Sequence, residues 1–107
     1  MPPKTARINE LKDLIKDREN MLKRYKDDLS ELPKGTLTVK TINGCLYYYR
    51  SYRDGSKVGT EYLGKDFEKI RHVKQTIERR KALKQIVRQI QQELLDYKKK
   101  IRALEKS

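Results

Sequence analysis

The chain has 107 residues, 36% hydrophobic and 39% charged, so it can hold one domain at most, with little material for a globular core. Its formal net charge of +12, from 27 basic and 15 acidic residues, indicates a nucleic acid first, and an acidic protein or anionic membrane second. No apolar run approaches the roughly 20 residues of a membrane span, the N-terminus lacks a signal peptide's apolar core, and one cysteine excludes an internal disulfide. We therefore expect a soluble cytoplasmic protein without membrane contact.

A first helix is predicted over residues 5–32, behind a basic tail of residues 1–4. Thr5 is a suitable N-cap, and Pro33 and Gly35 end the helix. The apolar positions alternate in steps of three and four once Arg18 is accepted as one polar member, which is a coiled-coil heptad. They are Ile8, Leu11, Ile15, Leu22, Tyr25, Leu29 and Leu32. With eight basic and seven acidic residues over 1–32, this helix is nearly neutral and is interpreted as a scaffold.

Residues 36–64 predict a three-stranded antiparallel meander. Asn43-Gly44 and Asp54-Gly55 supply the positive φ angles that two-residue hairpin turns need. The surrounding segments hold Val, Ile, Thr and five of the seven tyrosines, which suit a half-buried sheet.

Two-residue loops at both turns would sort the strand residues onto two faces. One face would carry Leu37, Val39, Leu46, Tyr48 and Leu63, near Arg50 and Glu61, and would pack on the helices. The other would carry Thr38, Lys40, Tyr47, Tyr49, Thr60 and Tyr62, continuing to Ser51 and Arg53. A register slip of one residue would exchange the faces.

A second helix is predicted over residues 66–106, capped by Asp66. Its C-terminal half carries a heptad stripe formed by Leu83, Val87, Ile90, Leu94, Tyr97, Ile101 and Leu104. The upstream residues Ile70, Val73 and Ile77 are out of phase by one residue, so we expect either a local change of supercoil or a shifted interface near residues 79–81. Thirteen positive and six negative residues over 66–107 make this helix strongly basic.

The fold class expected is α+β and mostly α, a single domain over 1–107. Two long helices would form an antiparallel coiled-coil hairpin with the meander inserted between them. At 1.5 Å per residue the longer second helix would extend roughly 18 Å past the first, from about Gln92 onward. Its uncovered stripe, Leu94, Tyr97, Ile101 and Leu104, would then be a homodimer or partner interface, although parallel and domain-swapped arrangements stay open.

Two basic surfaces are candidate nucleic-acid contacts. The sheet offers Lys40, Tyr47, Tyr49, Arg50, Arg53 and Lys57, and the second helix offers Arg79, Arg80, Lys81, Lys84 and Arg88. Such a sheet can enter the DNA major groove, or its tyrosines can stack on single-stranded bases. The alternative is structural: tyrosines that cover a thin core, and cations that keep a sheet edge or a helix face soluble.

Catalysis and cofactor binding find no support in the chain. His72 and Cys45 are the single residues of their types, no signature joins them, and they cannot form a zinc site without ligands from another chain. No glycine-rich phosphate loop is present. We expect a protein that is not an enzyme and binds no cofactor or metal.

The segment YYYRSYRDGSKVGTEYLG resembles the pattern Y-Y-Y-x-x-Y-R-x-G-x-K-V-x-x-x-Y-[IL]-G of short bacterial and phage proteins of unknown function, also flanked by charged helices. More loosely, it is similar to the arm-binding sheets of phage-type tyrosine integrases and to N-terminal strands of some transposases. The integrase likeness implies a sheet that enters the major groove, with Tyr47, Tyr49, Arg53 and Lys57 as its contacts. It also implies a phage or mobile element in a bacterial host cell, while the recombinase catalytic domain is missing.

Two functions follow as expectations. The first is a small dimeric nucleic-acid-binding accessory protein, with DNA favoured over RNA, whose sheet and basic second helix contact phosphates. The second is a phage coiled-coil protein that inhibits a host defence nucleoprotein complex, of the anti-CRISPR type, and docks through the uncovered stripe. Neutralising the sheet cations and disrupting the stripe would separate the two.

Overall fold

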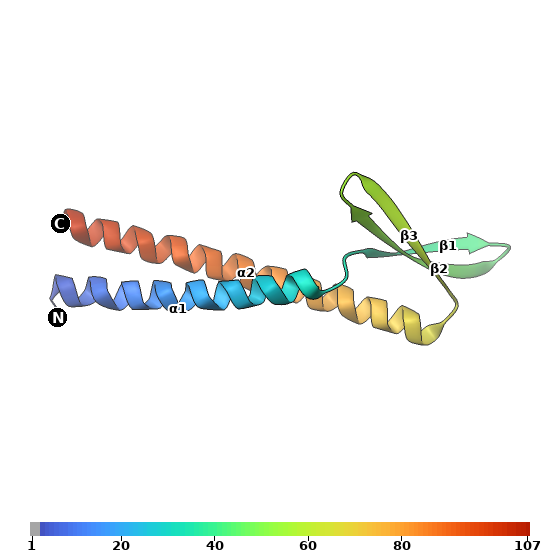
Figure 1. The fold of residues 1–107 in the computed structure, drawn as a ribbon, viewed down its shortest axis with the longest axis horizontal. Coiled ribbons are helices and arrows are strands. Elements are labelled where there is room, and N and C mark those ends of the chain that lie inside the picture. The colour runs from blue at the N-terminus through green and yellow to red at the C-terminus, as the bar shows by residue number, and fades with distance from the viewer. Residues whose placement is uncertain (1–2) are drawn as a thin grey trace. The chain divides into compact units, whose positions relative to one another are not determined.

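The computed structural model describes residues 3–107 and has the predicted helix–sheet–helix order (Figure 1). The elements are α1 (Lys4–Glu31), β1 (Thr36–Ile42), β2 (Cys45–Asp54), β3 (Lys57–Gly64) and α2 (Phe67–Lys106). The chain forms two compact units. The helical unit joins the chain up to Ser30 with Leu83–Ser107, and the sheet unit comprises Glu31–Ala82. Within residues 3–107, no helix is both long and apolar enough to cross a membrane.

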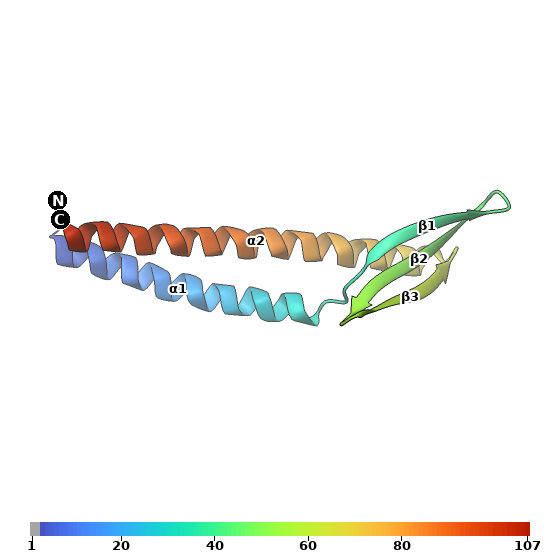
Figure 2. The same cartoon turned by 90° about the horizontal axis from the view of Figure 1, so that it is seen from above.

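In the helical unit, α1 and the C-terminal part of α2 lie side by side and run in opposite directions (Figures 1 and 2). Lys4 Nζ donates to the Ser107 carbonyl oxygen at 2.6 Å, so the beginning of α1 meets the end of α2. Further along, Arg18 Nε donates to Glu93 Oε2 at 2.6 Å. Lys4 and Arg18 are 14 residues apart, as are Glu93 and Ser107, so the two helices keep one register between these contacts.

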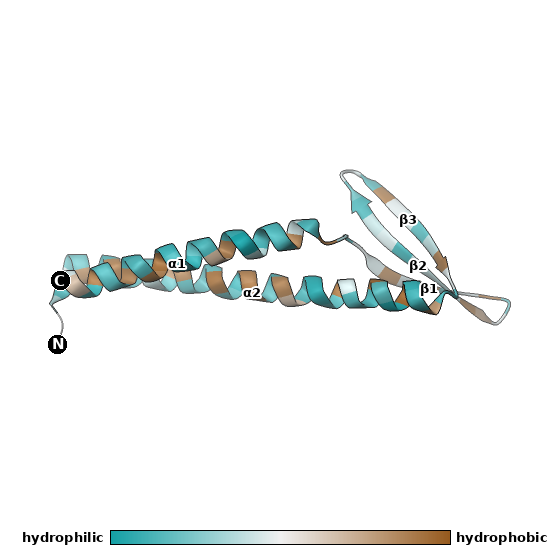
Figure 3. Cartoon of the chain, turned by 60° about the horizontal axis from the view of Figure 1, so that its bottom comes forward, coloured by the Kyte–Doolittle hydropathy of each residue, from teal (hydrophilic) through white to brown (hydrophobic). Residues whose placement is uncertain are grey.

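The seam between these helices is made by the residues with heptad spacing. Leu11 is 1% exposed, and α2 contributes Leu83, Val87, Ile90 and Leu94, all at most 9% exposed. Apolar residues recur between polar ones along both helices (Figure 3). Burial of this stripe contributes to the stability of both helices, since most helical stability in proteins comes from packing of an apolar face.

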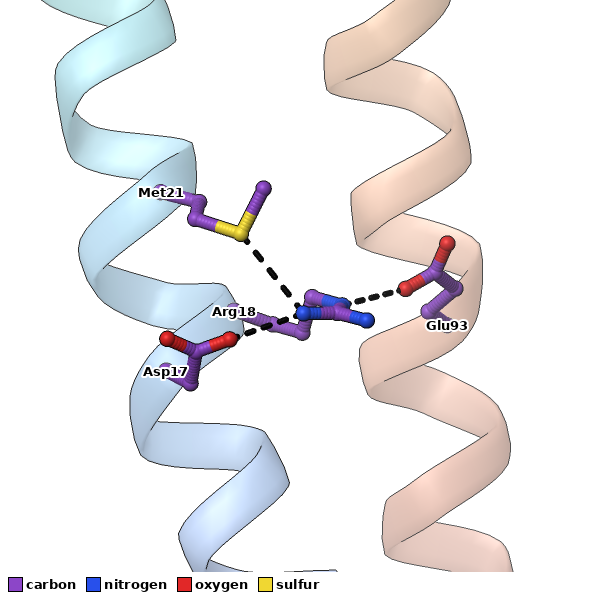
Figure 4. Close-up of polar contacts among 4 residues, drawn as sticks. All are labelled: Asp17, Arg18, Met21 and Glu93. Carbon is purple, nitrogen blue, oxygen red and sulfur yellow. Dashed lines mark hydrogen bonds and ion pairs between the residues drawn. The ribbon is translucent and has the colours of Figure 1, made fainter.

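Arg18 is the polar member of the seam, as the spacing predicts, and its side chain is 28% exposed. It reaches from α1 toward Glu93 of α2 (Figure 4). Besides Glu93, it donates to Asp17 Oδ2 at 2.8 Å and lies 3.6 Å from Met21 Sδ. The hydrogen bond to Glu93 raises the pKa of Arg18 above its ordinary value. Because the folded pKa is the higher one, the stabilisation that this charge contributes is lost as the pH rises into strong alkali.

The predicted overhang of α2 past α1 at its C-terminal end is wrong. The contact between Lys4 and Ser107 closes that end of the helical unit, and Leu94 is 7% exposed within the chain. The extra length of α2 lies at its N-terminal end, where Phe67–Ala82 belong to the sheet unit. Helix lengths alone specify how much one helix exceeds the other, but not which ends are aligned.

The phase slip of α2 coincides with the change of unit. Up to Ala82 the helix belongs to the sheet unit, where Ile70 is buried and Val73 and Ile77 are half-buried; the helical unit's stripe starts at Leu83. The expected shift of interface near residues 79–81 is therefore confirmed. Asp66 caps this helix as predicted, because its Oδ1 accepts from the backbone N–H groups of Glu68 and Lys69 at 3.1 and 3.3 Å. At the other helix, α1 begins at Lys4, so Thr5 lies inside it instead of capping it.

The sheet has the order β1-β2-β3 with both pairs antiparallel. Its first turn is Asn43-Gly44, where both residues have positive φ, as expected. Its second turn is Gly55-Ser56, because Asp54 pairs with Lys57, so the prediction of Asp54-Gly55 is off by one position. Gly55 has positive φ in the first loop position, the pattern of a type II′ turn, whereas Asp54 continues the strand.

This shift moves the β2–β3 pairing by two residues, so Tyr49 faces Tyr62 instead of Thr60. A shift of two keeps the side-chain alternation, and the predicted sorting of the two faces therefore holds. An irregularity between Tyr48 and Tyr49 leaves Leu63 as an extra residue in β3, and Leu63 is 4% exposed. Lys74 of α2 lies 6.0 Å from the Tyr48 ring, on the face with Leu63. Around Tyr48 and Leu63 that face lies against the start of α2, while Val39 and Leu46 on it stay 49% and 50% exposed. The other face is free.

Candidate nucleic-acid interface

The free face of the sheet carries a cluster of three tyrosines and two lysines, which we call the tyrosine face. Its members are Lys40 of β1, Tyr47 and Tyr49 of β2, Tyr62 of β3, and Lys65, which follows β3. The ring centroids of Tyr49 and Tyr62 are 5.2 Å apart, and those of Tyr47 and Tyr62 are 6.4 Å apart. Tyr62 keeps 59% of its surface exposed, so the cluster is open to ligands.

Strand register explains why these residues meet. Lys40 pairs with Tyr47 and Thr38 with Tyr49 between β1 and β2, while Tyr49 pairs with Tyr62 between β2 and β3. Paired residues and their neighbours two positions along the strand share one face, within reach of aromatic side chains. The register thereby brings Lys40, Tyr47, Tyr49 and Tyr62, which come from three strands, to one face.

Both lysine ammonium groups of the tyrosine face lie over rings. Lys40 Nζ is 4.8 Å from the centroid of Tyr49, and Lys65 Nζ is 5.4 Å from that of Tyr47. Each cation is attracted to the negative face of the ring, by about 0.5–1 kcal/mol at an exposed site. The lysines thus lie over the half-buried Tyr49 and Tyr47 rings, whereas the exposed Tyr62 ring is open to stack on a base, with positive charge nearby to attract phosphates.

Arg50 is placed away from this cluster, on the face that packs on α2. Its Nε donates to Glu61 Oε2 at 2.8 Å, its Nη1 donates to the Lys34 carbonyl oxygen at 2.6 Å, and its guanidinium covers the Tyr52 ring at 4.4 Å. With 21% of its side chain exposed, Arg50 ties residues 33–35 to the sheet. Its geometry is that of a structural residue.

Arg53 and Lys57 are exposed near the β2–β3 turn. Arg53 pairs with Val58 and alternates onto the free face, while Lys57 pairs with Asp54 and belongs to the other face. The sequence prediction therefore grouped residues that the sheet separates.

The predicted cations of α2 are also divided. Arg80 is half-buried, and its Nη1 donates to the Leu32 carbonyl oxygen at 3.1 Å. This bond gives a hydrogen-bond donor to the first carbonyl group after α1. Lys81 lies 3.9 Å from Glu78, with both side chains well exposed. Arg79, Lys84 and Arg88 are exposed.

A family model described as a domain of unknown function, DUF6788, matches residues 6–72 of the chain. This match covers α1 from its third residue, the entire sheet and the first residues of α2. The chain belongs to the DUF6788 family. Neither the curated proteins nor the solved structures contain a match to it.

In this DUF6788 protein all five residues of the tyrosine face lie within the family match. Tyr62 and Lys65 were not among the predicted site residues. The signal for Tyr62 was its expected place on the same face as Tyr47 and Tyr49. Lys65 gave no periodic signal, because it lies in the short connection after β3.

The four residues predicted as a dimer or partner interface lie in the helical unit of the DUF6788 protein. Leu94 is buried there, and Tyr97, Ile101 and Leu104 are half-buried. The stripe therefore has a partner within the chain. The reason for expecting it to be a homodimer interface or a docking site, that it was uncovered, no longer holds. Homodimerisation stays a prediction.

Proposed function

We propose that this protein is a small nucleic-acid-binding accessory protein that uses its tyrosine face to bind single-stranded DNA. The single observation that carries the proposal is the open arrangement of Tyr47, Tyr49 and Tyr62 with Lys40 and Lys65 over their rings. The chain's net charge of +12 supplies the general attraction to a polyanion.

The chemistry of the cluster favours contact with bases over contact with phosphates alone. Base–aromatic stacking contributes about 1–3 kcal/mol per base and requires a π-face that the ligand can reach. Tyr62 offers that surface, and the lysines at the edge of the cluster would meet the backbone that connects stacked bases. A duplex hides the faces of its bases, so unpaired strands fit this surface better.

The resemblance to phage and bacterial proteins with a similar tyrosine-rich sheet supports a role on a phage or mobile element. In this proposal Arg53 extends the surface toward the β2–β3 turn. Arg50 and Arg80 are left out, because each binds groups within the chain.

The test is fluorescence anisotropy with a labelled 20-nucleotide single-stranded DNA of mixed sequence, measured across a range of salt concentrations. The variant is Lys40→Gln with Lys65→Gln, and the matched control is Lys34→Gln with Lys69→Gln. All four are exposed lysines of the sheet unit, and both double variants lose two charges. Each phosphate contact contributes about 0.7 to the salt slope for single strands, so we expect the tyrosine-face variant to lose about 1.4.

A second variant, Tyr62→Ser, separates stacking from charge. We expect a loss of affinity of at least fivefold with an unchanged salt slope, since the smallest stacking contribution is about 1 kcal/mol. Circular dichroism verifies that each variant keeps its fold. Equal affinities for the wild type, the lysine variant and Tyr62→Ser would refute the proposal.

A further inference from the structure

The charges of the helical unit are sorted by side, which is visible once each seam residue is compared with its neighbours. The residues directly after the seam residues include eight basic and two acidic side chains. They are Asn9, Lys12, Lys16, Glu19, Lys23, Lys26 and Ser30 on α1, and Lys84, Arg88, Gln91, Leu95, Lys98, Arg102 and Glu105 on α2. All fourteen are exposed. We call this set the basic face.

The residues directly before the seam residues have the opposite balance. Three are basic and five acidic among Arg7, Glu10, Leu14, Asp17, Met21, Arg24 and Asp28 of α1 and Ile86, Gln89, Glu93, Asp96, Lys100 and Ala103 of α2. The near-neutral total charge of α1 therefore conceals two very different sides.

The antiparallel arrangement places the basic rows of both helices on the same side of the unit. The axes of two antiparallel helices define a plane, and an approximate two-fold axis perpendicular to that plane exchanges the two helices. This rotation leaves each of the two sides of the plane where it is. Residues that follow the seam on α1 therefore share a side with residues that follow it on α2. The contacts of Lys4 with Ser107 and Arg18 with Glu93 establish the opposite directions that this argument needs.

The eight cations of the basic face are not neutralised within the chain. Among residues 3–107, the ion pairs of the helical unit join Arg7 with Glu10 and Arg18 with Asp17 and Glu93, none of which belongs to this face. A solvated helix face normally alternates its charge signs, whereas between Lys12 and Lys26 the basic face carries four cations and one acid, and between Lys84 and Arg102 it carries four cations and no acid.

We infer that the basic face binds the phosphates of double-stranded DNA without reading its sequence. Lys12 to Lys26 and Lys84 to Arg102 form two rows about 21 and 27 Å long, at a rise of 1.5 Å per residue. Helix axes in contact are about 8–10 Å apart, so each row can follow one strand across the minor groove.

The basic face cannot bind bases by stacking, which is the way proposed for the tyrosine face of the sheet. It carries no aromatic ring, because Tyr25 and Tyr97 lie half-buried in the seam, and Leu95 is its one large apolar side chain. Bases have nothing to stack on, so the binding energy is electrostatic. The inference shares with the proposed function only the assumption that the ligand is a nucleic acid, since the surface lies in the other unit.

The test measures binding of a 20-base-pair duplex across salt concentrations. Lys16→Gln with Lys23→Gln removes two charges from the α1 row, Lys84→Gln with Lys98→Gln removes two from the α2 row, and Arg24→Gln with Lys100→Gln is the matched control on the opposite side. Glutamine preserves helix propensity, and Lys12→Gln with Lys26→Gln is a second α1 variant should the first fail to fold. With about 0.9 of salt slope per phosphate contact, each row variant should lose about 1.8 and the control nothing.

The outcomes separate this inference from the proposed function. Equal losses in the row variants and the control, or no duplex binding by the wild type, would overturn the basic face. If Lys40→Gln with Lys65→Gln weakens single-strand binding while the row variants leave duplex binding unchanged, the proposed function stands and this inference fails. If only the row variants weaken binding, this inference stands and the proposed function fails.

Discussion

At the scale of residues, Arg50 and Tyr52 are side chains of types common in binding sites, but their contacts serve the fold. Arg50 is cationic and lies in a tyrosine-rich strand, yet it binds Glu61, the Lys34 carbonyl and the Tyr52 ring. The Tyr52 ring in turn lies against Gly59, the glycine that pairs with it across the strands. This stack explains the one glycine of the chain that no turn or strand end accounts for.

Gly59→Ala should destabilise the protein by about 1–3 kcal/mol, the usual effect of overpacking. A Cβ at this position would overlap the Tyr52 ring and come within 2.6 Å of its hydroxyl oxygen, so the ring must leave its place beneath Arg50. Urea denaturation measures the change. In a Tyr52→Ala background the same substitution should be neutral or stabilising, because alanine suits a strand better than glycine; the same loss in both backgrounds would contradict this.

Arg18→Ala should lower the melting temperature more than Asp17→Ala does. Removing the guanidinium leaves the Glu93 carboxylate, 30% exposed, without its partner in the seam, whereas Asp17 is 62% exposed. Replacing both partners, as in Arg18→Met with Glu93→Leu, should restore or raise the melting temperature, since an apolar pair fits the stripe. Thermal unfolding followed by circular dichroism decides this, and a double variant less stable than Arg18→Ala would contradict the account.

At the scale of elements, the sequence predicted what local chemistry determines. Turn residues and alternation placed three strands and sorted Tyr47, Tyr49 and Tyr62 onto one face, and the heptad identified the seam with Arg18 in it. Which ends of α1 and α2 lie level could not be predicted, because the lengths of the two helices give only the difference between them and not the end at which α2 is longer. The roles of Arg50 and Arg80 were equally hidden, because both bind carbonyl oxygens that a sequence pattern does not show.

Glu19→Lys should strengthen duplex binding and increase the salt slope by up to about 1.8, because it removes the acidic residue in the middle of the α1 row and adds a contact. Asp28→Lys is the matched control, with the same charge change on the opposite side of α1. Anisotropy titrations with the 20-base-pair duplex compare the two. An equal gain in duplex affinity from both variants would contradict the basic face, because it would mean that only the net charge of the protein matters.

At the scale of the whole molecule, the chain combines two units with different surface chemistry. The sheet unit offers rings bordered by lysines, and the helical unit offers rows of cations without rings. The DUF6788 match includes the sheet and α1 but ends at residue 72, so the α2 row of the basic face lies outside it.

The most direct measurement is a ¹⁵N–¹H correlation spectrum of the wild-type chain, titrated with single-stranded DNA at about 0.1 M salt. The account predicts that the largest shifts occur at Lys40, Tyr47, Tyr49, Tyr62 and Lys65, while the opposite face near Tyr52 and Gly59 changes little. Spectra that do not change, or changes confined to the helical unit, would contradict the assignment of the tyrosine face as the binding site.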